Sequence, residues 1–108
     1  MDLSVVIPLY NESESIEELN NWITNTLNSS SISFEIIYID DGSLDGSWDK
    51  IKRLANNSNN IKGISFSKNF GKSQALNAGF IESKGNFVAT LDADLQDSPE
   101  EIPEMINK

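Results

Sequence analysis

The chain contains no cysteine and no histidine. The missing cysteines exclude disulfides and thiolate metal sites. The missing histidines exclude a Ser–His–Asp triad, imidazole acid–base catalysis and the usual zinc sites. Any chemistry here therefore depends on carboxylates, amides, hydroxyls, lysine ammonium groups and the backbone.

Basic residues are also scarce, and long apolar runs are missing. Eight Lys and Arg stand against 17 Asp and Glu, which gives a net charge of −9 at pH 7. Nucleic acid and anionic bilayers are bound through Lys/Arg patches, so neither is expected as the main partner. No apolar run approaches the roughly 18 residues that a membrane span needs, and no signal peptide precedes the first apolar segment. We therefore expect a cytoplasmic protein.

The length and the apolar pattern indicate one α/β domain. A chain of 108 residues is one domain at most. Four short apolar segments predict strands, and they alternate with helical patterns. The strands are predicted at Leu3–Pro8, Phe34–Ile39, Ile61–Phe66 and Phe87–Leu91. This alternation requires parallel strands with right-handed crossovers, so the sequence predicts a Rossmann-like sheet built from parallel βαβ units.

Details of the helices can also be predicted. Asn11 with Glu14 three residues later is typical of a helix N-cap. The third helix is predicted over Gly71–Ser83, with Gly85 ending it. Trp22 and Trp48 fall on apolar stripes, which predicts that both lie in the core. A last helix is predicted to begin at the segment Ser98-Pro99-Glu100-Glu101.

Polar clusters follow three of the four predicted strands. They are Tyr10-Asn11-Glu12, Asp40-Asp41-Gly42-Ser43 and the acidic segment Asp92–Asp97. In doubly wound sheets the carboxyl ends of the strands share one edge, and ligands bind there. Taken one at a time, each cluster is also compatible with an ordinary turn or helix cap. Their convergence on one edge predicts a binding site.

The acidic segment predicts a metal ligand set. Strand side chains alternate, so Asp92 and Asp94 point the same way if strand geometry persists. Two carboxylates side by side repel each other, and a divalent cation relieves that cost. Oxygen ligands favour Mg²⁺ or Mn²⁺. The alternative is a solvated acidic loop that caps the next helix.

The segment Gly71-Lys72-Ser73 is similar to the end of a phosphate-binding P-loop. That motif requires glycine five residues before Gly71, and Phe66 stands there, so the P-loop interpretation fails. Lys68 and Lys72 remain candidates for binding a diphosphate beside a helix N-terminus. The alternative is that both lysines are simply solvated.

Three ordered motifs carry a resemblance to a known family. They are Val5–Glu12, Asp40–Ser43 and Leu91–Asp97. With them the chain resembles the family 2 glycosyltransferases of the GT-A fold, above all dolichol-phosphate mannose synthases and their bacterial polyprenyl-phosphate relatives. The match covers essentially the whole chain but only the donor-binding half of such an enzyme. Residues 1–108 are thus expected to be the N-terminal nucleotide-sugar-binding part of a catalytic domain, truncated at its C-terminus.

The resemblance implies a set of site residues. The nucleotide sugar would be bound by Pro8, Tyr10, Glu12, Ile39, Asp41, Asp92, Ala93 and Asp94. Asp92, Asp94 and Gln96 would hold the Mg²⁺ or Mn²⁺ that bridges the two phosphates. The metal would neutralise charge on the leaving nucleoside diphosphate. No catalytic base is named, because the acceptor-side residues lie beyond this half.

The implied reaction moves a hexose, with inversion, from a GDP- or UDP-sugar to a polyprenyl phosphate. The full-length protein would then work at the cytoplasmic face of the membrane and touch it only through parts outside this chain. One alternative is an enzyme of the same fold that acts on a polysaccharide acceptor. Another is a donor-binding fragment without turnover. Independently of these alternatives, we expect the chain to tend to associate with a second copy through an exposed sheet edge.

Two other classes of nucleotide or phosphate protein are less compatible with the sequence. Sugar-1-phosphate nucleotidyltransferases open with a Gly-rich, basic loop after the first strand, where this chain has Pro8–Glu12. Phospho-acceptor receiver domains carry their acidic pair after the first strand, whereas Asp40 and Asp41 follow the second. A purely structural or interaction role remains a third alternative.

Overall fold

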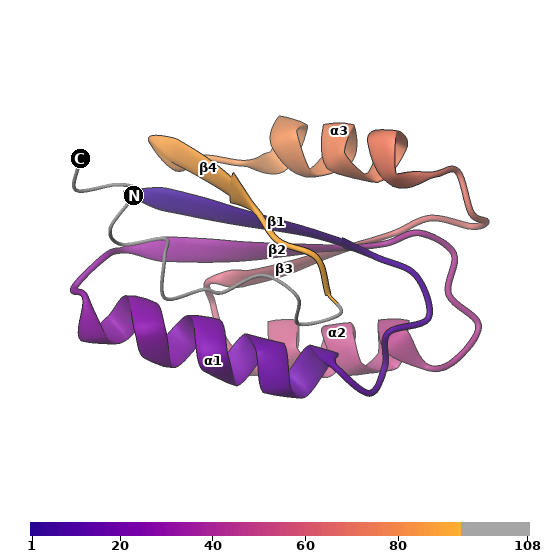
Figure 1. Cartoon of the computed structure of the whole chain (residues 1–108), viewed down its shortest axis with the longest axis horizontal. Helices are drawn as coiled ribbons and strands as arrows, with labels where there is room; N and C mark the ends of the chain where they lie inside the picture. Colours follow the sequence, from indigo (N-terminus) through magenta and orange to yellow (C-terminus); the bar gives the residue numbers. More distant parts are fainter. Residues whose placement is uncertain (94–108) are drawn as a thin grey trace.

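A computed structural model describes residues 1–93 of the chain as a four-stranded parallel sheet with helices on both faces (Figure 1). The elements are β1 (Leu3–Leu9), α1 (Ile16–Ser29), β2 (Phe34–Asp40), α2 (Ser47–Asn57), β3 (Ile61–Ser65), α3 (Lys72–Glu82) and β4 (Phe87–Thr90). The strand order is β3-β2-β1-β4. Helices α1 and α2 cover one face and α3 covers the other. The predicted Rossmann-like arrangement of βαβ units is confirmed, and the helix predicted from Ser98 lies outside the described residues.

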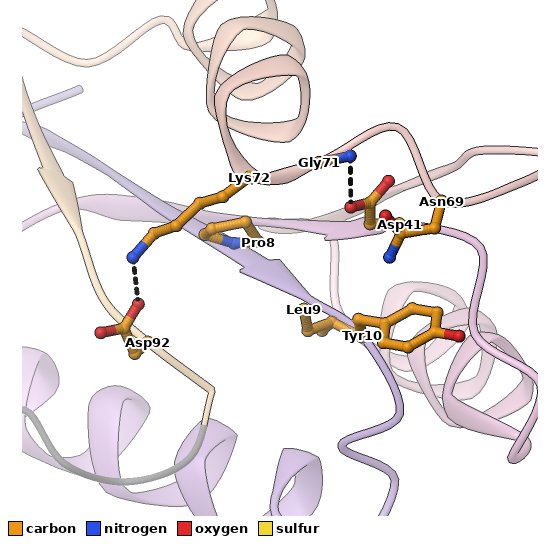
Figure 2. A pocket seen from close by; sticks show the side chains of 8 residues that line it. All are labelled: Pro8, Leu9, Tyr10, Asp41, Asn69, Gly71, Lys72 and Asp92. Atoms are coloured by element: carbon orange, nitrogen blue, oxygen red, sulfur yellow. Dashed lines mark hydrogen bonds and ion pairs between the residues drawn. The ribbon is translucent and has the colours of Figure 1, made fainter.

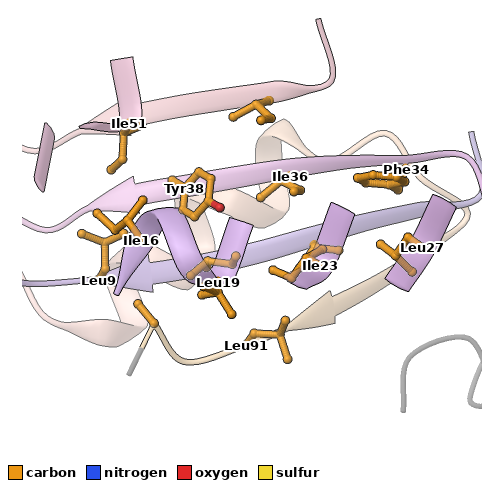
Figure 3. Close-up of a cluster of buried hydrophobic side chains, with 14 of the residues drawn as sticks. Leu9, Ile16, Leu19, Ile23, Leu27, Phe34, Ile36, Tyr38, Ile51 and Leu91 are labelled. Carbon is orange, nitrogen blue, oxygen red and sulfur yellow. The ribbon is translucent and has the colours of Figure 1, made fainter. Parts of the chain in front are cut away.

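Two apolar clusters hold the sheet between its helices. Every residue of β1 and β2 is buried, as expected of central parallel strands. The larger cluster lies under α1 and α2, and α1 contributes a stripe at helical spacing: Ile16, Leu19, Ile23 and Leu27 (Figure 3). The smaller cluster lies beneath α3 and consists of Val6, Ile37, Ile39 and Ala75. The central strands are thus fixed from both faces, and their carboxyl ends have defined positions.

Two predictions about helix ends were wrong. Helix α1 begins at Ile16 with Ser15 at the N-cap position, not at Asn11. Asn11 instead adopts a left-handed φ of 54°, which asparagine tolerates. Helix α3 ends at Glu82, and Gly85 lies against the β1 backbone, where a Cβ would come within 2.5 Å of Ser4 N. The glycine is needed for this close approach rather than to end the helix.

The two tryptophans differ from each other. Trp48 is half-buried and packs against the larger apolar cluster, so its side chain supports the core from the rim. Trp22 is half-buried on α1, so the prediction that it lies in the core was wrong. The stripe of α1 that faces the sheet runs through Leu19 and Ile23 instead.

A buried carboxylate lies at the amino-terminal end of the sheet, away from the polar strand exits. Glu35 accepts hydrogen bonds from Ser4 Oγ at 2.6 Å and from the Lys84 backbone N–H at 2.7 Å. Its other oxygen is 2.9 Å from Lys62 Nζ. Burial raises the pKa of Glu35, but these hydrogen bonds and the Lys62 charge outweigh burial and hold the pKa below its usual value of 4.5.

Glu35 should make stability depend on pH. A carboxyl whose pKa is lower in the folded chain stabilises the fold above its unfolded pKa, and this contribution is lost as the pH falls through the folded value. We expect the free energy of unfolding to decrease below about pH 4.5 and Glu35→Gln to flatten that decrease. Urea unfolding between pH 3 and 7 measures both slopes. Glu17→Gln, at an exposed position of α1, is the control; equal slopes for Glu35→Gln and wild type would contradict the assignment.

Candidate functional site

A pocket of about 280 Å³ lies at the carboxyl edge of the sheet (Figure 2). Its lining consists of Pro8, Leu9, Tyr10, Asp41, Asn69, Gly71, Lys72 and Asp92. These residues come from the end of β1, the exit of β2, the segment before α3, the start of α3 and the exit of β4. β1 pairs with β2 on one side and with β4 on the other, so the pocket lies where the strand order reverses. Open α/β sheets bind their ligands at this position.

The structure brings the three polar strand exits together, as predicted. Tyr10, Asp41 and Asp92 follow three different strands and line one pocket, with Pro8 between them. Three other residues assigned to the nucleotide sugar lie elsewhere: Ile39 is fully buried under α3, Ala93 belongs to the larger apolar cluster, and Glu12 is half-buried in the loop after β1. Asp94 and Gln96 lie outside the described residues.

Part of the lining was not assigned from the sequence. Leu9, Asn69 and Gly71 contribute to the wall, and Lys72, one of two candidate lysines, proves to be the one that lines the pocket. The sequence did contain a signal that could have pointed to Asn69. The polar stretch from Ser67 to Lys72 leaves the third strand at the same edge as the other clusters.

Asp41 connects β2 to the start of α3. Its two carboxylate oxygens accept hydrogen bonds from the backbone N–H groups of Phe70 at 2.7 Å and Gly71 at 3.0 Å. The side chain is buried, and these bonds satisfy a charge that would otherwise be costly to bury. Asp41 therefore shapes the pocket by holding the segment that carries Asn69 and Gly71.

The loops after β1 and β2 are joined by side-chain hydrogen bonds. Asn11 Oδ1 accepts from the Leu44 N–H at 2.9 Å, and the Asn11 N–H donates to Ser43 Oγ at 2.7 Å. Asp45 accepts from the Ser13 N–H at 3.1 Å. Burial raises the pKa of Asp45, but hydrogen bonds, first from the Ser47 hydroxyl, outweigh it and lower the pKa to about 2. The carboxylate thus stays ionised and keeps the two loops together.

Asp92 faces a lysine across the pocket. Lys72 Nζ lies 2.9 Å from Asp92 Oδ1, and the pair closes the side of the pocket next to β4. β4 ends at Thr90, so Asp92 lies outside the strand. Strand alternation, by which Asp92 and Asp94 would point the same way, therefore does not apply to Asp92. Within residues 1–93, no three acidic side chains gather into a potential metal site. Two carboxylates of the described residues line the pocket. Asp41 is buried and accepts the Phe70 and Gly71 N–H groups, whereas Asp92 is 43% exposed, so Asp92 is the carboxylate more accessible to a metal ion.

Comparison with known proteins gives the family. Residues 4–108 match the model of the family described as Glycosyl transferase family 2. The chain belongs to this family. An undecaprenyl-phosphate 4-deoxy-4-formamido-L-arabinose transferase of Aeromonas hydrophila is 44% identical over 105 residues, which are 96% of this chain and 32% of that protein. The chain spans about a third of the length of the curated relatives it matches.

Solved glycosyltransferase structures share the fold. A mannosyltransferase from Pyrobaculum calidifontis, in complex with GDP-Man and Mn²⁺, matches with a TM-score of 0.79 at 26% identity, over 94% of this chain and 30% of that one. S. aureus TarS in complex with UDP-GlcNAc matches with a TM-score of 0.77 at 25% identity, over 99% of this chain and 30% of that one. These neighbours are GT-A glycosyltransferases, so the predicted GT-A fold is confirmed. No helix in residues 1–93 is long and apolar enough to cross a membrane.

Proposed function

We propose that this chain binds the donor in a glycosyltransferase that moves a hexose, with inversion, from a nucleoside diphosphate sugar to a polyprenyl phosphate. One observation carries the proposal: the pocket at the switch in strand order joins an aromatic ring, a buried carboxylate and a charged pair. The family and the donor complexes of its structural neighbours support the donor class. The named activity of the relatives supports a polyprenyl phosphate acceptor.

The two ends of the pocket suit the two parts of such a donor. At one end Pro8 and the ring of Tyr10, which is 44% exposed, offer apolar surface to a nucleobase. Asp41 lies beside them and retains lone pairs able to accept the ring N–H of uracil or guanine. At the other end Lys72 and Asp92 provide the charges that a diphosphate and its metal require.

A divalent metal, Mg²⁺ or Mn²⁺, belongs to this proposal. Asp92 fits such an ion because it places a carboxylate at the pocket, 43% exposed and within reach of a bound diphosphate. Asp94 and Gln96, which follow it in the sequence, would complete the protein's ligands. Bound there, the ion would neutralise charge on the departing nucleoside diphosphate.

The acceptor side of the reaction belongs to the remainder of a longer protein. The relatives are about three times as long as this chain. We propose that their additional length corresponds to the acceptor site and to the contact with the membrane, at its cytoplasmic face. The 108 residues alone would then bind the donor without turnover.

Calorimetric titration with UDP and GDP, each with and without Mn²⁺, tests the donor site. We expect one nucleotide to bind only with Mn²⁺, and Asp92→Ala and Asp94→Ala to weaken that binding at least tenfold, since each removes a charged metal ligand. Asp49→Ala, on the exposed surface of α2, removes the same charge away from the pocket and should leave binding unchanged. A folded chain that binds neither nucleotide would contradict the proposal.

A further inference from the structure

Lys72 lies where the cationic and anionic groups of the pocket meet. It is the first residue of α3, and its side chain extends past Pro8 toward Asp92 (Figure 2). Nζ is 2.9 Å from Asp92 Oδ1, although the two residues are 20 positions apart in the sequence. Both side chains line the pocket. The ammonium therefore occupies one of the carboxylate oxygens that the proposed metal would use.

This ion pair is suited to exchange. The two side chains are 64% and 43% exposed, and exposed ion pairs contribute at most about 1 kcal/mol. A lysine ammonium is a compact charge on a flexible four-carbon stem, so it can change partners without moving the backbone. A stronger competing charge at Asp92 would displace it at small cost.

We propose that Lys72 holds Asp92 before the donor binds and transfers its ammonium to the donor diphosphate when metal and nucleotide enter. The inference rests on the donor site proposed above. A divalent ion at Asp92 repels the ammonium, because two cations then share one carboxylate. The diphosphate oxygens are anionic acceptors for the released N–H donors. Lys72 is thus a donor-binding residue whose partner changes with the state of the pocket.

The exchange predicts effects of opposite sign. Before nucleotide binding, Lys72 competes with the metal for Asp92, so its removal should strengthen binding of the metal alone. After nucleotide binding, it contacts the diphosphate, so its removal should weaken nucleoside diphosphate binding. A lysine that merely positioned Asp92 would give two losses, since both ligands would then meet a displaced carboxylate.

Lys72→Met tests the exchange because it removes the charge and keeps the stem. Electron paramagnetic resonance of free Mn²⁺ measures binding of the metal alone, and calorimetry compares UDP and GDP with uridine and guanosine. We expect Mn²⁺ to bind up to about fivefold more tightly. Diphosphate affinity should fall roughly ten- to a hundredfold, as for a lost charge-assisted hydrogen bond. Nucleoside binding should not change, and Lys72→Arg should restore most of the diphosphate affinity.

Lys68→Met is the matched control. It removes the same charge four residues earlier in the chain, before α3 begins. Lys68 Nζ lies 5.2 Å from the centre of the Phe70 ring, and the residue is not part of the pocket lining. Weaker Mn²⁺ binding by Lys72→Met, or the same diphosphate affinity for both variants, would overturn the inference. The proposed donor site would still stand in that case. If the wild-type chain binds neither UDP nor GDP, the donor site itself is wrong and the inference fails with it.

Discussion

Gly42→Ala is expected to destabilise the chain by about 2–5 kcal/mol and to abolish donor binding. Gly42 has a φ of 81°, a left-handed conformation that strains alanine. A Cβ there would also come within 2.6 Å of Asn69 N, and it would meet the Lys68 carbonyl carbon still more closely. Both contacts are with backbone, so the segment before α3 must move. Urea unfolding measures the stability, and nucleotide titration with Mn²⁺ measures the binding.

Gly46→Ala separates the two causes. Gly46 has a similar φ of 89°, but its Cβ would meet nothing within 4 Å. The control therefore carries the backbone strain, about 1–2 kcal/mol, without the clash, and should keep donor binding. Equal losses from the two variants would show that the segment before α3 yields freely and that its contact with Gly42 does not shape the pocket.

Asp41→Ala is expected to cost about 2–4 kcal/mol and to remove donor binding. The change deletes the acceptors of the Phe70 and Gly71 N–H groups and leaves both without their charged partner. The segment that forms one wall of the pocket then loses its attachment to β2. Hydrogen exchange should show faster exchange at these two amides, while amides in β1 keep their protection.

Two further variants provide comparisons for the stability and donor binding of Asp41→Ala. Asp41→Asn keeps one acceptor oxygen and should fall between alanine and wild type. Asp92→Ala should lose donor binding while the unfolding midpoint stays unchanged, because its ion pair with Lys72 is exposed. An Asp41→Ala variant with wild-type stability and normal amide protection would mean that the carboxylate does not hold this segment.

The fold was predictable from the sequence because its signals are local. The apolar runs at β1 and β2 are continuous since both strands are covered on both faces, and the polar exits mark where each strand ends. The Asn11 prediction failed for a different reason. A capping residue and a residue that bonds to a distant loop share one local pattern, and the choice depends on Leu44 and Ser43, which lie over 30 positions away.

The pocket lining was predictable where a side chain lies at the end of a strand or shortly after it. Pro8, Tyr10, Asp41 and Asp92 are of this kind, and their convergence follows from the parallel topology. Ile39 differs because strand alternation turns its side chain under α3, where it packs with Val6 and Ala75. The pairing of Lys72 with Asp92 joins a helix start to a strand exit, and no spacing in the sequence encodes that distance.

The hydrogen bonds between the loops after β1 and β2 also affect how this pocket can be altered. Asn11 and Ser13 in the first loop are held by Ser43, Leu44 and Asp45 in the second. A substitution of Asn11, Ser43 or Asp45 therefore removes a hydrogen-bond acceptor of the other loop, and the two loops behave as one structural unit. A graft intended to change the preferred nucleobase should carry both loops together, since either one alone would arrive without the side chains that fix its shape.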